Sequence, residues 1–423
     1  MQTTHRILHR VGSQHTLLGF LVTLSMLLFT LFFTACGNTG GTTTGTASAA
    51  GSVHTSATRG STTVSGAAGT GNSSVASSAG NIPAKTLQFI RIRMVTPALG
   101  WGLTASAVFT TADGGKSWSP AGELPGAQLK VVAGEFLNAR FAWIVVRAVA
   151  PASANLNPIQ VLRTVDGGRN WQPASTPLST SASDSPGTPN FVNTQDGWIE
   201  VVTNGGPGAG SESVDIFRTT DGGDVWKKVA STDGPSGLSR EGIKSGISFK
   251  DAQNGWATAS TASSTPWLYV THNGGSNWQR QALPGVKPNS SYLTTPPVFF
   301  GTQGILPVSV SLQNGTGTAI YTTTNGGKTW NAPQALAPFD LMSTDSIYVA
   351  DTAHAWAINR NGQLSATTSA NWQQWHLLAG NAAQYKLTQM SFVNASDGWA
   401  IGTVNGTKTL VDTTDGGHTW KQE

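Results

Sequence analysis

Three small groups of residues have the types and the spacing that could do chemistry. Arg91 and Arg93 alternate with apolar residues, so both side chains project from one face of an expected strand. Glu200 lies two residues after Trp198. Similar tryptophans recur along the chain, and most of them are followed two residues later by an apolar or β-branched residue. Cys36 is the only cysteine, which excludes an internal disulfide. The arginines predict a contact for an acidic partner, Glu200 predicts either a solvated strand end or a carboxyl group of raised pKa, and Cys36 predicts a modification site.

Other kinds of chemistry find little support in the sequence. The four histidines after residue 80 are scattered along the chain, at His272, His354, His376 and His418. A metal site needs several ligands that meet at one place, so we expect no metal and no cofactor. The sequence contains neither a nucleophile elbow nor a phosphate-binding glycine loop.

The elements that would position these residues follow from an eight-residue box, T-x-D/N-G-G-x-x-W, whose closing tryptophans are 45 to 55 residues apart. A period of about 50 residues indicates an array of equal units, each long enough for a four-stranded propeller blade. In the six complete copies the acid or amide and the closing tryptophan are Asp113 and Trp118, Asp166 and Trp171, Asp221 and Trp226, Asn273 and Trp278, Asn325 and Trp330, and Asp415 and Trp420. A degenerate copy is assigned to 368–375, where Ala370 and Asn371 replace the acid and the first glycine.

A second signature runs in phase with the box. In most units an apolar or aromatic residue precedes a tryptophan by seven positions, as Phe136 precedes Trp143. In each unit we therefore expect a first strand that ends near the aromatic residue and a second strand that begins with this opening tryptophan. A third strand, the box turn and a short fourth strand follow. Seven such units between 87 and 423 predict an all-β fold, a seven-bladed β-propeller with four-stranded blades.

The box is expected to do structural work. Asp-Gly and Asn-Gly favour tight hairpins because glycine and asparagine accept positive φ at little cost. The acid or amide can accept backbone N–H bonds within the turn, and the threonine hydroxyl can add another bond. The seven boxes are expected to act as independent hairpin locks. The degenerate copy would be the weakest, and rebuilding 370–372 as Asp-Gly-Gly would be neutral or stabilising unless Trp372 has a packing role of its own.

The N-terminal segment has the features of an export signal. Arg6 and Arg10 precede an apolar run at 17–33, and two small residues stand before Cys36. The segment 33–36 resembles the lipobox of bacterial lipoproteins, with phenylalanine where that pattern prefers leucine. The alternative is a signal-anchor helix, because a run of 17 apolar residues lies at the lower limit for a membrane span. We expect a lipoprotein signal peptide over 1–36 and an exported protein that a lipid on Cys36 anchors to the outer face of the cytoplasmic membrane.

The composition changes twice along the chain. Residues 37–82 are mostly Gly, Ser, Thr and Ala, which predicts a disordered tether, and the propeller is expected over 83–423. The formal net charge of the chain is +4, but the first 80 residues carry three arginines and no acid, which leaves +1 on the rest. Net charge therefore gives no support for a nucleic-acid partner.

The units resemble the Asp-box, or bacterial neuraminidase, repeat. Their arrangement is most similar to the seven-bladed propellers of the photosystem II assembly and stability factor family, and the resemblance covers 87–423. It implies Asp-box hairpins in each blade and a membrane-anchored lipoprotein that binds other proteins without catalysis. The expected partner is a protein or a surface polymer, and a photosystem client is not carried over to this chain.

The alternative is a glycoside hydrolase of the sialidase or xyloglucanase type, because related Asp-box proteins include both. Such enzymes need two carboxyl groups that face one sugar bond. The sialidase pattern also has an Arg-Ile-Pro element and a tyrosine nucleophile. Here the first strand, 89–94, has no proline after Arg-Ile, and none of the five tyrosines lies in a recognisable acid-tyrosine setting. A pair of inward-facing carboxylates in the structure would favour the enzyme, and their absence would favour the scaffold.

Overall fold

The computed structural model describes residues 81–423, apart from 127, 150–155, 209, 264, 286–289, 313–314 and 334. The expected signal peptide at 1–36, with Cys36, and nearly all of the expected tether at 37–82 lie outside the described residues. Within the described part of the chain, no helix is long and apolar enough to cross a membrane.

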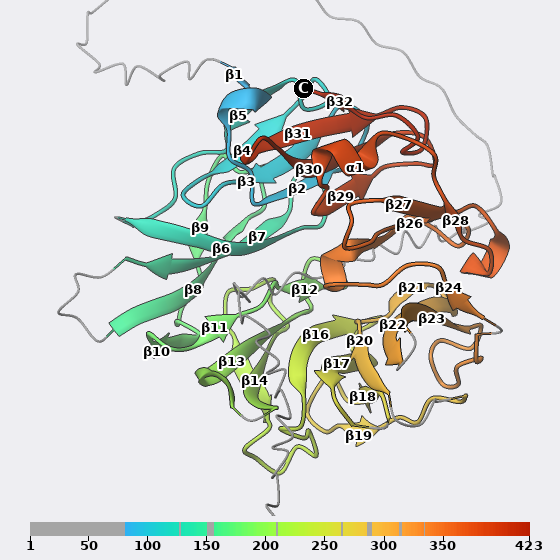
Figure 1. Cartoon of the computed structure of the whole chain (residues 1–423). Coiled ribbons are helices and arrows are strands. Elements are labelled where there is room, and N and C mark those ends of the chain that lie inside the picture. Colours follow the sequence, from blue (N-terminus) through green and yellow to red (C-terminus); the bar gives the residue numbers. More distant parts are fainter. Residues whose placement is uncertain are drawn as a thin grey trace, which may run out of the picture.

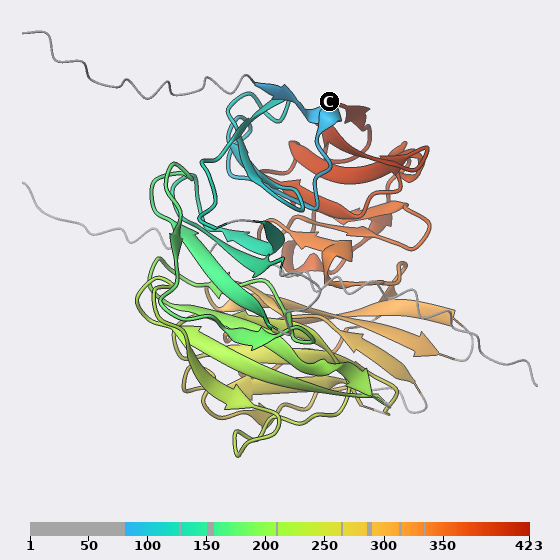
Figure 2. The same cartoon turned by 90° about the vertical axis from the view of Figure 1, so that its left-hand side faces the viewer.

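Antiparallel sheets follow one another around a ring, which confirms the prediction of an all-β propeller (Figure 1). The chain passes around the ring once, so the last strands lie beside the first ones in both views (Figure 1, Figure 2). Strand β1 already includes Ile82, one residue before the expected start of the propeller.

Five of the sheets have four or five strands each. The first contains β1 (Ile82–Pro83), β2 (Arg91–Met94), β3 (Gly100–Leu103), β4 (Val108–Thr111) and β5 (Ser117–Pro120). The second contains β6 (Leu129–Phe136), β7 (Ala142–Ala148), β8 (Leu156–Thr164), β9 (Gln172–Pro173) and β10 (Ser179–Ser181). The third contains β11 (Ser185–Pro186), β12 (Asn190–Phe191), β13 (Gly197–Gly208), β14 (Ser211–Thr219) and β15 (Lys227–Ser231). The last two contain β25 (Ile347–Val349), β26 (Ala355–Ile358), β27 (Leu364–Thr367) and β28 (His376–Leu377), and then β29 (Gln389–Phe392), β30 (Gly398–Val404), β31 (Thr407–Thr413) and β32 (Lys421–Gln422).

The remaining sheet has nine strands, which corrects the expectation of seven separate blades. Its strands are β16 (Ile243–Phe249), β17 (Gly255–Thr261), β18 (Trp267–Thr271), β19 (Gln279–Arg280), β20 (Ser291–Thr294), β21 (Val298–Phe300), β22 (Gln303–Leu312), β23 (Gly315–Thr323) and β24 (Leu336–Ala337). Strand β20 pairs with both β17 and β22, so its backbone joins the fourth and fifth sequence units into one sheet. The described residues therefore form five separate blades and one double-sized sheet, and the first three blades have five strands rather than four.

Short helices lie between some of the strands. Among the described residues they are three 3-10 helices and one α-helix, at Ala84–Thr86, Thr344–Ser346, Ala370–Trp372 and α1 (Ala382–Tyr385).

Aromatic side chains fill the space between neighbouring sheets. The opening tryptophan of one unit stacks on the aromatic residue of the next, with ring centroids 3.5 Å apart for Trp143 and Phe191 and 3.6 Å apart for Trp356 and Phe392. These large rings are almost completely buried, so they supply much of the apolar contact that holds successive sheets together. The sequence signature with its spacing of seven thus belongs to the interfaces between units.

The box forms a hydrogen-bonded turn. Thr111 donates from its hydroxyl to Asp113 Oδ1 at 2.8 Å and accepts the backbone N–H of Gly115 at 2.9 Å, while Asp113 accepts the backbone N–H of Ser117 at 3.0 Å. Gly114 and Gly115 have φ of 81° and 96°, which suits glycine because it has no Cβ. The same threonine bond, 2.7–2.9 Å long, is accepted by Asp166, Asp221, Asn273, Asn325 and Asp415. The closing residues Trp118, Trp171, Trp226, Trp278, Trp330 and Trp420 are all buried.

The boxes also tie the units to one another, so the expectation of independent locks is wrong. At four interfaces the opening tryptophan of one unit donates its indole N–H to the carbonyl oxygen of the first box glycine in the next unit. The pairs are Trp143 with Gly222 (2.7 Å), Trp198 with Gly274 (2.9 Å), Trp356 with Gly416 (2.8 Å) and Trp399 with Gly114 (2.6 Å). The last pair joins the final unit to the first. Each of these four box turns therefore stabilises both its own hairpin and an interface.

The ring closes through side chains that reach across to backbone groups. Gln389 on β29 accepts the backbone N–H of Ile92 and donates to the carbonyl oxygen of Ile92, both at 3.1 Å. Ser391 accepts the backbone N–H of Met94 at 2.9 Å. Because β2 and β29 belong to different sheets, these bonds satisfy buried backbone groups that no neighbouring strand reaches there.

The degenerate box differs from its sequence assignment. The turn threonine is Thr367, with Ser369 in the place of the acid, so the turn has one residue more than the other boxes. Trp372 takes the place of the second glycine, with φ of 53°, and accepts the indole N–H of Trp375 at its carbonyl oxygen. Its ring is 1% exposed and shares a core cluster with Ile305, the residue that replaces the opening tryptophan of the preceding unit. Trp372 therefore has a packing role, and rebuilding this box as Asp-Gly-Gly is not expected to be neutral.

Candidate functional site

The first candidate site lies where the inner strands of four units converge on the central channel. Arg91 and Arg93 of β2 line one small cavity there, together with residues of β6, β25 and β29. The two arginines do share this site, as their alternation predicted. Arg91 is buried rather than open to solvent, and Arg93 is half-buried, donates to the hydroxyl of Tyr348 and lies 5.8 Å from the centre of its ring.

Acidic groups line the same cavity and reduce its positive character. Glu135 of β6 is buried, and Asp345 comes from the 3-10 helix before β25. Burial raises the pKa of Asp345 to about 7, and the positive charge of Arg91 opposes that rise. The cavity has a volume of about 30 Å³. That is about the space of one water molecule, whereas ligand pockets are typically about 300–1,000 Å³. A sugar ring does not fit in this cavity.

Glu200 lies elsewhere, between the third sheet and β16. Its side chain is 1% exposed, and Oε2 has no hydrogen-bond partner within the described part of the chain. Glu212 of β14 and Lys244 of β16 are buried beside it. Glu212 Oε2 accepts the backbone N–H of Lys244 at 2.6 Å, and Lys244 Nζ donates to four backbone carbonyl oxygens at 2.9–3.3 Å. The Nζ also lies 4.7 Å from the centre of the Trp267 ring.

The protonation of this buried cluster is perturbed. Burial raises the pKa of Glu200 to about 8, with the negative charge of Glu212 adding to the rise and Lys244 opposing it. Burial likewise raises the pKa of Glu212 and lowers that of Lys244 to about 8. Of the two expectations for Glu200, the structure therefore supports the raised pKa. Because all three groups are closed off from solvent, the cluster is a structural feature of the interface between units.

Sequence reasoning missed Glu212 and Lys244. Lys244 follows Ile243 in a strand that is otherwise apolar or small, and that contrast was the available signal. Glu212 carries no comparable signal, because it comes near the solvent-facing bend of a long hairpin and only the packing of β16 against β14 encloses it.

The acidic residues of the boxes accept hydrogen bonds within their own turns. Asp113 and Asp166 line a groove of about 600 Å³ between the first two units, with Arg140 and Arg169. The Asn170 side chain bonds to Asp166, and this and further hydrogen bonds lower the pKa of that carboxyl to about 2. Across the described ranges, no group of three or more His, Cys, Asp or Glu side chains is arranged to hold a metal ion.

Comparison with known proteins identifies the fold. No protein-family model and no curated protein sequence matches the chain. The structure of YCF48 bound to D1 peptide is 16% identical, with a TM-score of 0.50, over 79% of this chain and 96% of that chain. YCF48 from Cyanidioschyzon merolae is 18% identical, with a TM-score of 0.51, over 78% of this chain and 97% of that chain. These structures support a propeller like that of photosystem II assembly factors, and at such identities they show the fold alone.

A glycoside hydrolase is also among the similar structures. The Niastella koreensis GH74 enzyme is 13% identical over 77% of this chain and 67% of that chain, with a TM-score of 0.31. That TM-score is too low to support an argument about catalysis in this chain.

Proposed function

We propose that this chain is a non-enzymatic binding scaffold that holds a polypeptide partner against its propeller. The observation that carries the proposal is the partly exposed charge of Arg93 beside a cavity of about 30 Å³, because a partner can contact this charge from outside, whereas the cavity has no room for a sugar. The fold shared with YCF48, one structure of which holds a D1 peptide, supports the same proposal. We further infer that the nine-stranded sheet represents two blades, so that the ring is an array of seven Asp-box units.

Neither pair of acids favours the hydrolase alternative. Glu135 and Asp345 line one cavity, but its volume of about 30 Å³ does not admit a sugar ring. Glycoside hydrolases place two carboxyl groups about 5–9.5 Å apart on either side of a sugar bond in a site that the substrate enters. Glu200 and Glu212 are 1% and 4% exposed, and Glu212 accepts the backbone N–H of Lys244. Their raised pKa follows from burial, which is also what excludes a polysaccharide chain from them.

The proposed contact at the channel uses Arg93 more than Arg91. Arg93 is the more exposed of the two, and Tyr348 holds its guanidinium in place. Arg91 lies close enough to Asp345 to affect its pKa, so its charge is partly offset within the protein. Arg93 can therefore meet an acidic group of a partner, in a contact that salt weakens as the Debye length falls below about 10 Å.

The experiment compares binding and turnover in one preparation of the full chain. The purified protein is incubated with sialosides, with xyloglucan and with a membrane extract. We expect retention of a polypeptide from the extract that Arg93→Ala reduces and that Arg169→Ala, an exposed arginine in the box groove, does not. Release of sugar from either substrate that is lost in Glu200→Gln would show that the chain is a hydrolase.

We also propose that the protein is exported and anchored through a lipid on Cys36. The support is the sequence alone: the charged start, the apolar run at 17–33 and the unique cysteine after small residues. Cys36→Ser should abolish incorporation of labelled lipid and leave the protein unprocessed or released. Wild-type protein that keeps residues 1–35 after export would contradict the proposal.

A further inference from the structure

The groove of about 600 Å³ between the first two units lies where one interface departs from the pattern of four others. At those four, the opening tryptophan donates to the carbonyl oxygen of the first box glycine in the next unit. Here Trp101 donates instead to the carbonyl oxygen of Asn138, at 3.0 Å. Gly167, the first box glycine of the second unit, lines the groove. The two units are therefore joined differently at the place where the groove has formed.

Two exposed arginines of the second unit lie along one wall. Arg140 comes from the turn between β6 and β7 and Arg169 from the box turn, and both line the groove. The Arg140 guanidinium donates to the carbonyl oxygen of Val165 at 3.4 Å. Among the described residues, neither arginine forms an ion pair. Each guanidinium has five N–H donors in a planar fork that matches a carboxylate, so this wall can bind a carboxylate ligand.

Two carboxylates line the same groove, Asp113 from the first unit and Asp166 from the second. Burial raises the pKa of Asp113, but hydrogen bonds from Ser117 and Thr111 outweigh this effect and lower the pKa overall. Hydrogen bonds from Asn170 lower the pKa of Asp166 to about 2. Both groups are therefore ionised at neutral pH, and neither can be the general acid that a glycoside hydrolase needs.

The charges of the lining restrict the kind of anion that fits. The two arginines and the two ionised acids cancel in formal charge. A polyanion with closely spaced charges, such as a nucleic acid, would be repelled by Asp113 and Asp166. A ligand with few carboxylate groups and many hydrogen-bond donors can instead contact the arginines and the acids together.

The rest of the lining suits a sugar. Thr110, Ser117 and Ser119 line the groove, as do the exposed apolar residues Leu99 and Ala139. The hydroxyl groups of a sugar both donate and accept hydrogen bonds, so they can bond to carboxylates and to hydroxyl side chains alike. The C–H groups of a sugar ring can cover apolar side chains that water otherwise surrounds.

An extended polypeptide fits this groove less well. A sheet binds such a segment by pairing with an exposed edge strand. Strand β5 contributes Ser117 and Ser119 to one wall, but it lies between β1 and β4 in its sheet. The opposite wall is formed by the turns at 139–140 and 166–169. Neither wall therefore offers an edge strand for pairing.

We propose that the groove between the first two units binds an acidic oligosaccharide, with its carboxylate groups on Arg140 and Arg169 and its hydroxyl groups on Asp113 and Asp166. The groove volume lies within the range of about 300–1,000 Å³ that ligand sites show. The site is separate from the polypeptide contact at Arg93, so the inference goes beyond the proposed function. A chain with both sites would hold a polypeptide at the channel and a carboxylated surface glycan at the box groove.

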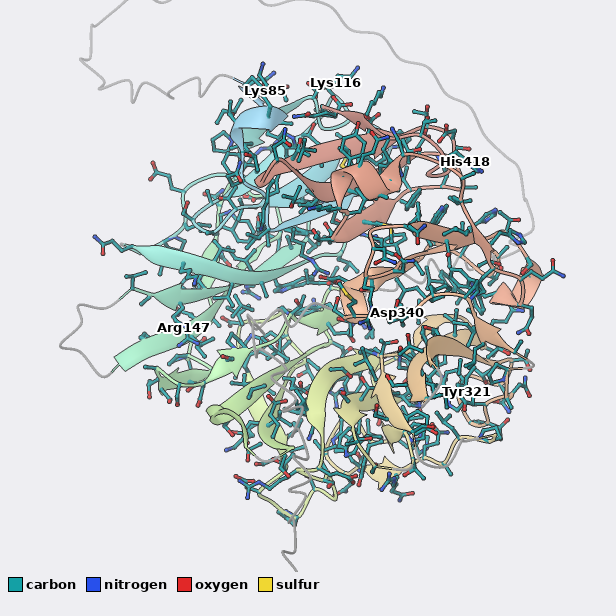
Figure 3. The ribbon with its side chains drawn as sticks, viewed as in Figure 1. Lys85, Lys116, Arg147, Tyr321, Asp340 and His418 are labelled. Atoms are coloured by element: carbon teal, nitrogen blue, oxygen red, sulfur yellow. The ribbon has the colours of Figure 1, made fainter. Side chains whose placement is uncertain are left out.

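The test measures binding of a fluorescent trimer of galacturonic acid to the full chain. The methyl ester of the same trimer, which has the same rings without the negative charges, is the control ligand. Arg169→Ala and Arg140→Ala each remove one guanidinium from the groove. Lys85→Ala removes an exposed positive charge outside the lining, at the upper edge of the ring in Figure 3.

We expect the acidic trimer to bind wild type and Lys85→Ala alike. Each arginine variant should weaken binding by about tenfold or more, because it loses a charge-assisted contact to a carboxylate. The methyl ester should bind wild type more weakly than the acid by a similar factor. Added salt should weaken binding of the acid and leave that of the ester unchanged.

Three results would overturn the inference: no binding of the acidic trimer, equal binding of the methyl ester, or equal binding by both arginine variants. A capped peptide of glutamate and serine in the same assay tests for a polypeptide groove, and its binding in place of the trimer would also overturn it. The proposed scaffold function is tested separately, because retention of a membrane polypeptide should depend on Arg93 and not on Arg169.

Discussion

Replacing Trp372 by glycine tests most sharply how the fifth and sixth units pack. The indole is 1% exposed and shares a cluster with Ile305. Removing a buried tryptophan side chain lowers the unfolding free energy by about 3–5 kcal/mol, through lost contacts and the cavity that remains. Glycine also relieves the strain of a φ of 53° at this position. That relief is about 1 kcal/mol, so we expect a net loss of about 2–4 kcal/mol.

The matching substitution is Ile305→Trp. Other units have the opening tryptophan at the position of Ile305, and the second box glycine of the next unit at the position of Trp372. In the box of the second unit, for example, a Cβ on Gly168 would lie 3.1 Å from the ring of Trp101. Ile305→Trp alone should overpack against Trp372 and cost about 1–3 kcal/mol. The double variant restores one large and one small residue, so it should be more stable than the sum of the single changes by about 2 kcal/mol or more.

Urea denaturation of the four proteins measures this coupling directly. A neutral effect of Trp372→Gly would show that the indole does not fill the interface. Strictly additive effects of the two changes would show that Ile305 and Trp372 do not substitute for the tryptophan and glycine of the other units.

Other predictions concern the turns and the buried charges. Gly222→Val should lower the unfolding free energy by about 1–3 kcal/mol, because Gly222 has φ of 77° and its Cβ would lie 2.8 Å from the Thr194 carbonyl oxygen; thermal melts should show no comparable loss for Gly208→Val, which meets open space. Glu200 has a folded pKa of about 8, above its unfolded value, so its contribution to stability is complete below about pH 4.5 and is lost as pH rises to about 8. The melting temperature of Glu200→Gln should therefore rise relative to wild type between these pH values, and a difference that stays flat, as expected for the exposed Glu123→Gln, would contradict this. Arg91→Ala should lower the melting temperature more than Arg93→Ala, because Arg91 is the more buried of the two; equal melting temperatures would show that burial does not matter here.

The repeat made the propeller predictable, because a turn such as 111–118 has local chemistry that its own residues specify. The joining of the fourth and fifth units could not be predicted in the same way. Strand β20 lies in a connection between units and carries no box, and its pairing with β17 and β22 depends on how the two units approach each other. The sequence shows a smaller residue, Ile305, in place of tryptophan and a larger one, Trp372, in place of glycine. That these two changes compensate for each other could not be predicted without knowing that the two positions pack together.

The candidate site was predictable only in part. The alternation of Arg91 and Arg93 correctly placed both at one cavity, because side-chain direction in a strand follows from the backbone. Their burial did not follow, because it depends on Glu135 and Tyr348 from other units that converge on the channel. Glu200 was recognised from its departure from the pattern, but its environment comes from Glu212 and Lys244, which are distant in sequence.

The most direct measurement of the central claim is site-specific photo-crosslinking in cells that express the full chain. A photoreactive amino acid is placed at position 93, at the channel, or at position 169, in the box groove. The scaffold account predicts a crosslinked polypeptide from position 93 that is absent from position 169. The absence of a polypeptide adduct at position 93, together with release of sugar by the same protein, would contradict it.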